Sequence, residues 1–496
     1  MTDQLVDYQN LVAGERRSAA SGEWIDSYNP YLGKPWARIP RCLENDVHHA
    51  VQAAKSALKS SEWKKMTPTE RGKRLVRLAE LIEARAPEFG ALETRDNGKL
   101  IAEMSAQAAY LAENYRYLGG LADKIEGRVL PMDKASKFAF TKREPLGVIA
   151  AITAWNSPLL LLAWKLAPAL AAGNTVVIKP SEHASVSTLE FVSLFAEAGF
   201  PDGVINTVTG YGHEAGAALA AHPDVAKVAF TGGDATGAKI YEAAAPSLKH
   251  VGLELGGKSP NIIFADANMD AAVMGAISGI FAASGQTCIA GSRLLVERSA
   301  KQEVTERLIE VAKSAVLGDP SKLETQVGPV TTTQQRSHIL KMIEAGKAEG
   351  ARCVLGGGEP EAAEFADGWF VEPTIFDGVD NAMTIAQTEI FGPVLSIIPF
   401  DSDEEAVAIA NDTPYGLASG VWTSDISRAF KMSDALETGT VWINTYRAVS
   451  FMAPFGGYKR SGIGRESGQE AIDAYLQTKT VWIETEESVA NPFVIR

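Results

Sequence analysis

A single cysteine near the middle of the chain stands in a context suited to covalent chemistry. Cys288 lies within a run from Ala271 to Ser292 that contains no charged residue. Apolar residues recur there at helical spacing, which predicts a buried helix that ends at Ser284–Gly285, followed by a loop that presents Cys288. Polar residues inside the run argue against a membrane span, because lipid would leave them unsatisfied. A thiol held this way can act as a nucleophile, although an isolated free cysteine is more commonly buried and inert.

An acid earlier in the chain could serve as the base for such a thiol. Glu254 is the one charged residue between Val251 and Gly257. A carboxylate so placed is expected to be partly desolvated, which raises its pKa toward that of a useful general base. A nucleophile with a nearby base is the minimal requirement for covalent catalysis. The alternative is a core cysteine and a surface glutamate at the end of a strand.

The composition restricts the classes of protein and partner. A chain of 496 residues with 46% hydrophobic and 22% charged residues is expected to form two or three globular domains. The net charge of −14 argues against nucleic acid and against an anionic membrane as partners. The three cysteines and seven histidines show no disulfide or metal-ligand spacing, so we expect no metal. The start, Met1–Gln4, lacks the features of a signal peptide, and we expect a cytoplasmic protein.

Hydrophobic patterns predict alternating strands and helices. Residues 1–45 are expected to form short strands and turns, and residues 47–121 helices. The expected order then is strand 148–152, strand 175–178, helix 187–198, strand 204–208, helix 215–221 and strand 227–231. Such alternation indicates an α/β fold with a parallel sheet that binds nucleotides at its strand ends. A second alternating block spans about 257–457, and the strand 479–483 is more suited to pairing with another chain than to a core.

Two glycine-rich loops are candidate phosphate sites. Gly210–Gly212 with Gly216 follows one strand, and Gly232–Gly237 follows the next and opens a helix. Neither has the spacing of a phosphate-loop lysine motif. Alone, each loop is about as consistent with an ordinary strand-to-helix turn as with a phosphate site.

The segments Glu254–Lys258 and Gly285–Arg293 resemble the signature segments of the NAD(P)-dependent aldehyde dehydrogenase superfamily, in its non-acylating branch. The resemblance covers nearly the whole chain. It implies an α/β fold of two α/β domains with parallel-type sheets plus a small β oligomerisation element. The implied NAD-binding domain comprises 1–125 and 146–256, and the domain with the nucleophile 257–457. The segments 126–145 and 458–496 would join subunits into a homodimer or homotetramer.

The resemblance also implies a cofactor site and selects the loop at Gly232 for the pyrophosphate. The chain departs from the family at Gly233, where a serine is usual. Lys179 and Glu182 would hold the adenosine ribose, and Glu182 would favour NAD over NADP because a carboxylate repels a 2′-phosphate. The implied cofactor-binding residues are Ile152, Thr153, Ala154, Trp155, Lys179, Ser181, Glu182, Gly212, Phe230, Thr231, Gly232, Gly233, Gly237, Leu255, Glu389 and Phe391.

The resemblance assigns five residues to catalysis. Cys288 would attack an aldehyde and carry the thioester, and Glu254 would activate the water that hydrolyses it. Asn156 would stabilise the oxyanion together with the backbone amide of Cys288, a role worth roughly 3 kcal/mol in comparable sites. Lys165 and Glu466 match positions implicated in proton relay, and they could equally form a structural salt bridge.

The substrate is an aldehyde in this interpretation. By resemblance its tunnel is lined by Leu160, Trp164, Thr287, Ile289, Val449 and Phe455. This mostly apolar lining suits a medium-sized aliphatic or aromatic aldehyde. Arg447 would lie near the mouth, where it could orient an aldehyde that also bears a carboxylate. It could instead pair with an acid across a subunit interface.

Three other functions remain open at this stage. An acylating dehydrogenase would pass the thioester to coenzyme A and should lack a base such as Glu254. A cysteine hydrolase would need a histidine base, and no histidine stands in a comparable motif. A binding protein on a retired enzyme scaffold should have lost Cys288, Glu254 or Asn156, and all three are present.

Overall fold

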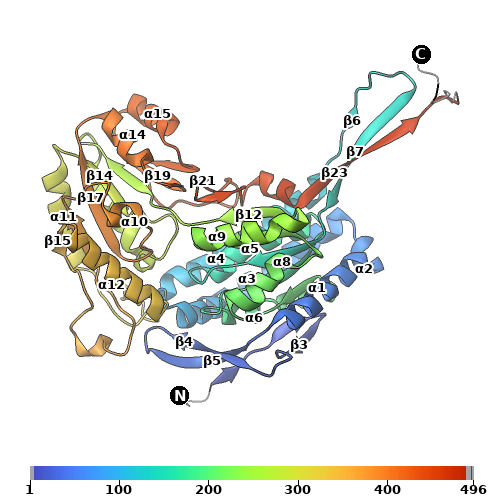
Figure 1. The fold of residues 1–496 in the computed structure, drawn as a ribbon, viewed down its shortest axis with the longest axis horizontal. Helices are drawn as coiled ribbons and strands as arrows, with labels where there is room; N and C mark the ends of the chain where they lie inside the picture. Colours follow the sequence, from blue (N-terminus) through green and yellow to red (C-terminus); the bar gives the residue numbers. More distant parts are fainter. Residues whose placement is uncertain (1–4, 488–492, 494–496) are drawn as a thin grey trace.

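The computed structural model describes residues 5–487 and 493. Two mostly parallel sheets form its centre, so the expected α/β class is confirmed (Figure 1). Residues 1–4, on which the expectation about a signal peptide rests, lie outside the described part, as does most of 488–496. Within the described residues, no helix is both long enough and apolar enough to cross a membrane.

The first sheet has six strands in the order β10-β9-β8-β11-β12-β22. Their bounds are β8 Val148–Ile152, β9 Thr175–Lys179, β10 Ile205–Thr207, β11 Val225–Thr231, β12 His250–Glu254 and β22 Gly462–Ile463. The first five are parallel, and β22 joins the edge antiparallel to β12. All five residues of β8 are buried, as expected for a central strand with helices on both faces.

Alternate residues of β8 belong to two different cores. Ile149 and Ala151 pack under one helical layer, whereas Val148, Ala150 and Ile152 pack under the other. The first layer contains α3 Pro68–Asn97, α4 Ile101–Leu121, α5 Pro158–Ala171, α6 Val186–Phe191 and α7 Leu194–Glu197. The second contains α1 Glu44–Lys59, α8 Ala217–Ala221 and α9 Asp234–Ala244. The helix predicted over 187–198 is therefore two short helices, α6 and α7.

The second sheet has seven strands in the order β15-β16-β17-β14-β13-β19-β20. Their bounds are β13 Pro260–Ile263, β14 Arg293–Glu297, β15 Arg352–Leu355, β16 Thr374–Asp377, β17 Val394–Phe400, β19 Ala418–Trp422 and β20 Thr440–Ile443. Only β15 runs antiparallel. The helices around the second sheet are α10 Met269–Phe281, α11 Lys301–Lys313, α12 Thr333–Ala348, α13 Thr384–Gln387, α14 Asp403–Asn411 and α15 Ile426–Ala435.

The two sheets present opposite edges to the space between them. The segments after β8, β11 and β12 leave the carboxyl edge of the first sheet. The segments before β13, β14 and β17 lead into the amino edge of the second. Loops from both edges contact each other, since a side chain on Gly257 would clash with the backbone of Cys288. This arrangement places Cys288 opposite the carboxyl edge of the first sheet.

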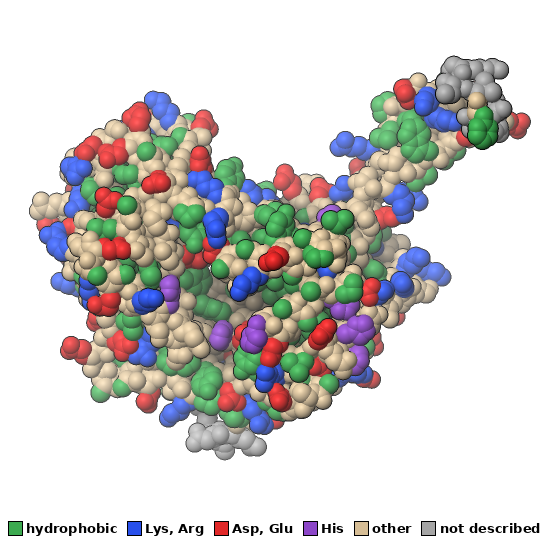
Figure 2. Space-filling model, in the orientation of Figure 1, with side chains coloured by type: hydrophobic (Ala, Val, Ile, Leu, Met, Phe, Trp, Pro, Cys, Tyr) green, Lys and Arg blue, Asp and Glu red, His purple; other side chains and the backbone are tan. Residues whose placement is uncertain are grey.

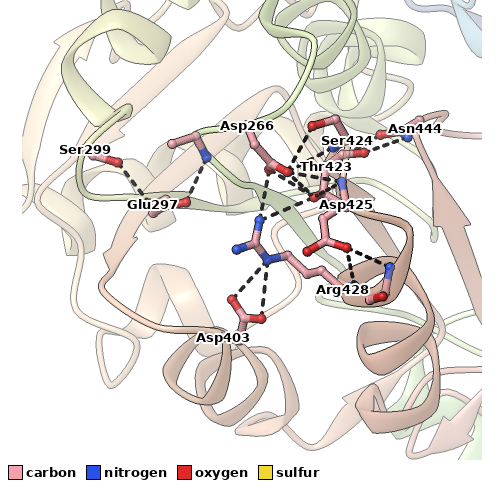
Figure 3. A network of polar contacts seen from close by, with 11 residues as sticks. Asp266, Glu297, Ser299, Asp403, Thr423, Ser424, Asp425, Arg428 and Asn444 are labelled. Atoms are coloured by element: carbon pink, nitrogen blue, oxygen red, sulfur yellow. Dashed lines mark hydrogen bonds and ion pairs between the residues drawn. The ribbon is translucent and has the colours of Figure 1, made fainter.

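A polar network fixes the opposite, carboxyl edge of the second sheet (Figure 3). Asp266, after β13, accepts hydrogen bonds from the Thr423 hydroxyl and the Ser424 amide, after β19. Arg428 of α15 bridges Asp266 and Asp403 of α14. Because the donors of this group find their acceptors within it, the network has a structural role and joins two strands to two helices.

A three-stranded arm projects from the body, with the order β23-β7-β6 (Figure 1). It consists of β6 Val129–Leu130, β7 Lys137–Pro145 and β23 Leu476–Glu484. The strand predicted at 479–483 lies within β23, and it pairs along its whole length with β7 of the same chain. Its other edge carries no strand among the described residues. Figure 2 shows hydrophobic side chains on this exposed arm.

The first residues of the described chain form short strands, as predicted. The strands β1 Val6–Asp7, β4 Trp24–Asn29 and β5 Lys34–Pro40 make one small sheet, and β2 Asn10–Val12 with β3 Glu15–Arg17 a hairpin. The remaining small elements are α2 Ser61–Lys64, β18 Tyr415–Gly416 and β21 Tyr458–Lys459.

Candidate active site

A cavity of about 210 Å³ lies between the two facing sheet edges. It is lined by Ala154, Trp155, Asn156, Leu161, Thr231, Gly232, Gly233, Glu254, Leu255, Gly256, Cys288, Gln335, His338, Glu389 and Phe391. The candidate nucleophile, base and oxyanion donor therefore share one cavity with the second glycine-rich loop. The first loop, at Gly210–Gly212, does not line it.

A strained turn holds Cys288 in place. The helix α10 ends at Phe281, three residues earlier than predicted, because Ala283 and Ser284 adopt left-handed backbone conformations with φ of 54° and 50°. Gly285 follows with φ of 70°, and its α-carbon packs so tightly against Gly392 that a β-carbon would lie 2.0 Å from the Gly392 carbonyl oxygen. Such strain persists only where surrounding contacts enforce it.

Two carboxyl groups influence the Cys288 thiol. Burial and, to a smaller extent, the neighbouring Glu389 and Glu254 carboxyls together raise its pKa to about 12, although the backbone N–H groups of Cys288 and Ile289 oppose this. The thiol form is therefore favoured until a positive charge or a base reaches the sulfur.

Glu254 ends β12 and is buried deeply enough to act as a base. Burial, followed by the charge of Glu466, raises the pKa of Glu254 well above its usual value, although Lys165 and Arg465 oppose this. Its Oε2 atom is buried and has no hydrogen-bond partner among the described residues. The desolvation predicted from the uncharged sequence around it is present.

A series of hydrogen-bonded charged side chains lies behind Glu254. The Lys165 ammonium donates to Glu466 Oε1 and to Thr231 Oγ1, each at 2.6 Å. A second cavity, of about 170 Å³, is lined by Lys227, Glu466 and the back of Glu254. Glu254 thus borders both cavities and connects the cavity that contains Cys288 to this series of charged side chains.

Asn156 follows β8 and precedes α5, so a rigid strand and helix fix its backbone. Its Nδ2 donates to the Gln286 carbonyl oxygen at 3.1 Å, which ties it to the turn before Cys288. Gln286 is itself fully buried, and its Oε1 accepts from the Thr331 amide. The second N–H of Asn156 has no protein acceptor among the described contacts, which leaves it available to an oxyanion.

The residues expected to hold a dinucleotide form two groups. Beside the cavity, Gly233 has open space where a side chain would stand, and Glu389 Oε1 accepts from the Gly257 amide at 3.0 Å. Burial raises the pKa of Glu389 to about 7. Trp155 and Phe391 meet edge to face with ring centres 5.2 Å apart. The buried Thr153 hydroxyl has no partner in the described part of the chain, so polar capacity remains for a ligand.

The second group lies beyond β9. The Lys179 ammonium donates to Glu182 Oε2 at 2.9 Å, and Glu182 Oε1 lies 3.4 Å from the Gly212 amide. The predicted pair is therefore preassembled, with Gly212 beside it. Ile152, Ser181, Phe230 and Gly237 lie on the same strand ends and loops but do not line the main cavity.

The predicted tunnel residues largely share one apolar core. Trp164 and Phe455 pack with ring centres 5.1 Å apart, and both are buried together with Ile289. Leu160 packs against the same core, Thr287 is half-buried, and Val449 is exposed. Cys288 packs against this core, but none of the predicted tunnel residues lines the main cavity.

The sequence left open that Arg447 pairs with an acid of another subunit. In the structure, its acidic partner belongs to the same chain. The Arg447 guanidinium pairs with Glu103 of the same chain at 3.3 Å and donates to the Ser278 carbonyl. Sequence reasoning could not find this contact, because the two residues stand 344 positions apart.

Several lining residues were missed. Gln335 and His338 of α12 reach the cavity, and Gln335 donates to the Ile390 carbonyl oxygen at 2.7 Å. Their spacing of three positions on a helix was the available signal. Leu161, beside the predicted Leu160, was missed for lack of any chemical signal. Among the described residues, no group of three or more His, Cys, Asp or Glu side chains could hold a metal ion.

Comparisons with known proteins agree with this geometry. The profile of the aldehyde dehydrogenase family matches residues 17–481, and the chain belongs to this family. It is 50% identical over 475 residues to (Z)-2-((N-methylformamido)methylene)-5-hydroxybutyrolactone dehydrogenase of Acinetobacter baylyi, covering 95% of this chain and 96% of that protein. It is 44% identical to betaine aldehyde dehydrogenase of Sinorhizobium fredii, covering 96% of both.

Solved structures give the same result. Betaine aldehyde dehydrogenase of Staphylococcus aureus in complex with NAD+ superposes with a TM-score of 0.97 at 38% identity, covering 99% of this chain and 97% of that one. An NAD+ complex of aldehyde dehydrogenase from Bacillus cereus gives 0.94 at 43% identity, covering 97% of both. The protein is an NAD-dependent aldehyde dehydrogenase, and the function expected from its sequence is confirmed.

Proposed function

We propose that this enzyme oxidises its aldehyde through a thioester on Cys288 that is hydrolysed with the help of Glu254. The observation that carries the proposal is the single cavity lined by Cys288, Asn156 and Glu254, with Glu389 and Phe391 on the cofactor side. An acylating enzyme needs no buried base beside its thioester, so the position of Glu254 favours hydrolysis.

The first half-reaction forms the thioester. The Cys288 thiol gives its proton to water and the resulting thiolate bonds to the aldehyde carbon, while the free N–H of Asn156 donates to the oxygen that becomes negative. Bound NAD supplies a positively charged nicotinamide ring, which favours the thiolate, and accepts the hydride. Collapse of the oxyanion breaks the carbon–hydrogen bond and leaves the acyl group on Cys288.

The second half-reaction releases the acid. Glu254 takes a proton from water, the hydroxide attacks the thioester carbon, and the carbon–sulfur bond breaks to regenerate the Cys288 thiolate. The proton on Glu254 must then leave a buried site. Glu466 lines the cavity behind Glu254 and pairs with the buried Lys165, and this pair would offer the route by which the proton reaches solvent.

The cofactor roles follow the two preassembled groups. Lys179 and Glu182 would hold the adenosine ribose, Gly232 and Gly233 the pyrophosphate, and Glu389 the nicotinamide ribose. The residues that would complete this site are Ile152, Thr153, Ala154, Trp155, Ser181, Gly212, Phe230, Thr231, Gly237, Leu255 and Phe391. The preassembled ion pair of Lys179 and Glu182 supports the ribose role.

We propose an aldehyde that also bears a carboxylate as the substrate. The Acinetobacter relative is named for a 5-hydroxybutyrolactone, and such a lactone is the ring-closed form of a 4-oxo acid. Arg447 would attract that carboxylate and repel the quaternary ammonium group of a betaine aldehyde. The carbon chain would lie along Leu160, Trp164, Thr287, Ile289, Val449 and Phe455.

The larger-scale assignments are also proposals. Segments 1–125 and 146–256 would form the NAD-binding domain and 257–457 the domain of the nucleophile. The arm, from 126–145 and 458–496, would join subunits in a homodimer or homotetramer. Three free cysteines among the described residues suit a reducing compartment such as the cytoplasm.

The test is to mix the purified protein with NAD and a panel of aldehydes, with and without coenzyme A, and to follow NADH and the product. We expect a free carboxylic acid and a rate independent of coenzyme A. Cys288→Ala should abolish oxidation while NAD still binds, as measured by calorimetry. Turnover that requires coenzyme A, or substantial activity of Cys288→Ala, would overturn the proposal.

A further inference from the structure

A buried lysine, a half-buried arginine and an amide converge on one carboxylate oxygen between α4 and the loop after β20. Glu103 Oε1 lies 3.0 Å from the Lys99 ammonium, 3.3 Å from the Arg447 guanidinium and 3.2 Å from Gln107 Nε2. The Lys99 side chain is only 2% exposed. Two positive charges thus share the negative charge of Glu103, and the lysine end of the group is shielded from solvent.

The other groups near this cluster do not restore the balance. The remaining contact of Lys99 is the neutral Ser157 hydroxyl at 3.2 Å, and that of Arg447 is the Ser278 carbonyl oxygen. Glu93 is a further carboxyl on which the charge of Lys99 acts, and it accepts a hydrogen bond from the Leu159 amide. Burial raises the pKa of Glu93 to about 7 despite the charge of Lys99. It is at most a partial counter-charge near neutral pH.

Two residues of the cluster stand next to residues of the reaction centre in the sequence. Ser157 directly follows the oxyanion donor Asn156. Arg447 directly follows Tyr446, whose hydroxyl donates to the Ile289 carbonyl at 3.1 Å, next to Cys288. Arg447 also holds a left-handed backbone conformation, with φ of 64°. A bulky side chain rarely adopts this conformation, and such strain is concentrated at binding and catalytic sites.

We propose that Lys99, with Arg447 and Ser157, forms a subsite that binds the carboxylate of a short oxo acid, such as 4-oxobutanoate, while its aldehyde reaches Cys288. The substrate carboxylate supplies the second negative charge for the two cations and accepts from the Ser157 hydroxyl. This inference rests on the proposed function, of which it specifies the substrate class, and it adds Lys99 as the residue that determines specificity.

The first experiment compares kcat/KM for 4-oxobutanoate and for butanal, which has the same number of carbons and no charge. Lys99→Met should lower the value for 4-oxobutanoate about ten- to a hundredfold, mainly through KM, and change that for butanal less than about threefold. Lys99→Arg should recover most of the loss. Lys249→Met is the matched control, because Lys249 is another buried lysine, donates to the Ala221 carbonyl and touches none of these residues.

A variant that removes a negative charge, rather than a positive one, distinguishes an electrostatic effect on the substrate from damage to the fold. Glu103→Gln removes the resident negative charge, so it should raise the preference for 4-oxobutanoate over butanal, whereas a merely structural cluster would lose activity with both. An equal loss for both substrates in Lys99→Met and in Glu103→Gln would overturn the subsite.

Thermal unfolding tests the subsite without turnover. Succinate should raise the Tm of the wild-type protein, succinamide should not, and the difference should vanish in Lys99→Met. Equal effects of succinate and succinamide would refute carboxylate binding even if the enzyme oxidises aldehydes. Absence of oxidation with every aldehyde would refute the proposed function alone, and the succinate result would still decide the subsite.

Discussion

The protonation states of two side chains control the chemistry at the residue scale. Cys288 is held as a thiol by burial and by two carboxyls, whereas burial keeps Glu254 protonated to a higher pH than an ordinary glutamate. The same desolvation that makes Glu254 a strong base therefore suppresses the nucleophile. The positively charged nicotinamide ring of bound NAD would resolve the conflict, because it would favour the thiolate without protonating the base.

Glu254→Gln should separate the two half-reactions. We expect a burst of one NADH per active site, followed by a steady state about 10²- to 10⁴-fold slower, because only hydrolysis of the thioester needs the base. In the wild type kcat should fall as pH drops through the raised pKa of Glu254, so this acidic limb should lie well above pH 4.5. Rapid mixing over a pH series measures both. Loss of the burst itself would assign Glu254 to thiol deprotonation.

Glu182 should determine the choice between NAD and NADP. Its carboxylate is already held by Lys179, so it would meet a 2′-phosphate with a fixed negative charge. Glu182→Ser should lower the ratio of kcat/KM for NAD to that for NADP by about tenfold or more. Glu182→Gln is the matched variant, since it keeps the shape and the acceptor for Lys179 but removes the charge. A wild-type enzyme that prefers NADP would contradict this role.

At the scale of elements, the turn between α10 and β14 fixes the nucleophile against the loop before β17. Gly285 makes that contact, and its φ of 70° together with the approach to Gly392 excludes a side chain. Gly378 provides a matched control, because its φ of 68° is similar but nothing lies within 4 Å of its missing side chain.

Gly285→Ala should therefore lower the free energy of unfolding more than Gly378→Ala does. The left-handed backbone alone costs about 1–2 kcal/mol, which is all we expect from Gly378→Ala. Gly285→Ala adds a clash with backbone, and it should also slow the NADH burst by displacing Cys288. Denaturant unfolding and burst kinetics on both variants measure the two effects. Equal stability and equal bursts would show that the contact does not position the cysteine.

The elements near the chemistry were more predictable than the contacts between them. The strand 148–152 has the predicted bounds, because five consecutive apolar residues after a glycine leave little alternative. The end of α10 was misplaced because nothing in Ala283 and Ser284 signals a left-handed backbone, which the packing of Gly285 imposes. The cluster of Lys99, Glu103 and Arg447 was missed for a different reason. Lys99 and Glu103 stand four positions apart, but Arg447 joins them from 344 positions away, and that contact exists only after folding.

At the scale of the whole molecule, the arm is the feature that a single chain does not explain. It leaves the body of the molecule (Figure 1). It also exposes large apolar side chains, among them Trp482 at 58% and Val129 at 68%. The strand β23 also offers an unpaired edge among the described residues. Exposed apolar edge strands invite pairing with another chain. We therefore expect the arm to be covered by a second copy.

Light scattering should give two or four times the mass of one chain at micromolar concentration. The double variant Trp482→Asp with Ile483→Asp should shift the protein toward monomers, because it places charges on the surface that a partner would cover. Phe430→Asp is the control, since Phe430 of α15 is 67% exposed and lies on the body rather than on the arm. It should leave the mass unchanged. A wild-type monomer, or an unchanged mass in the double variant, would mean that the arm does not hold subunits together.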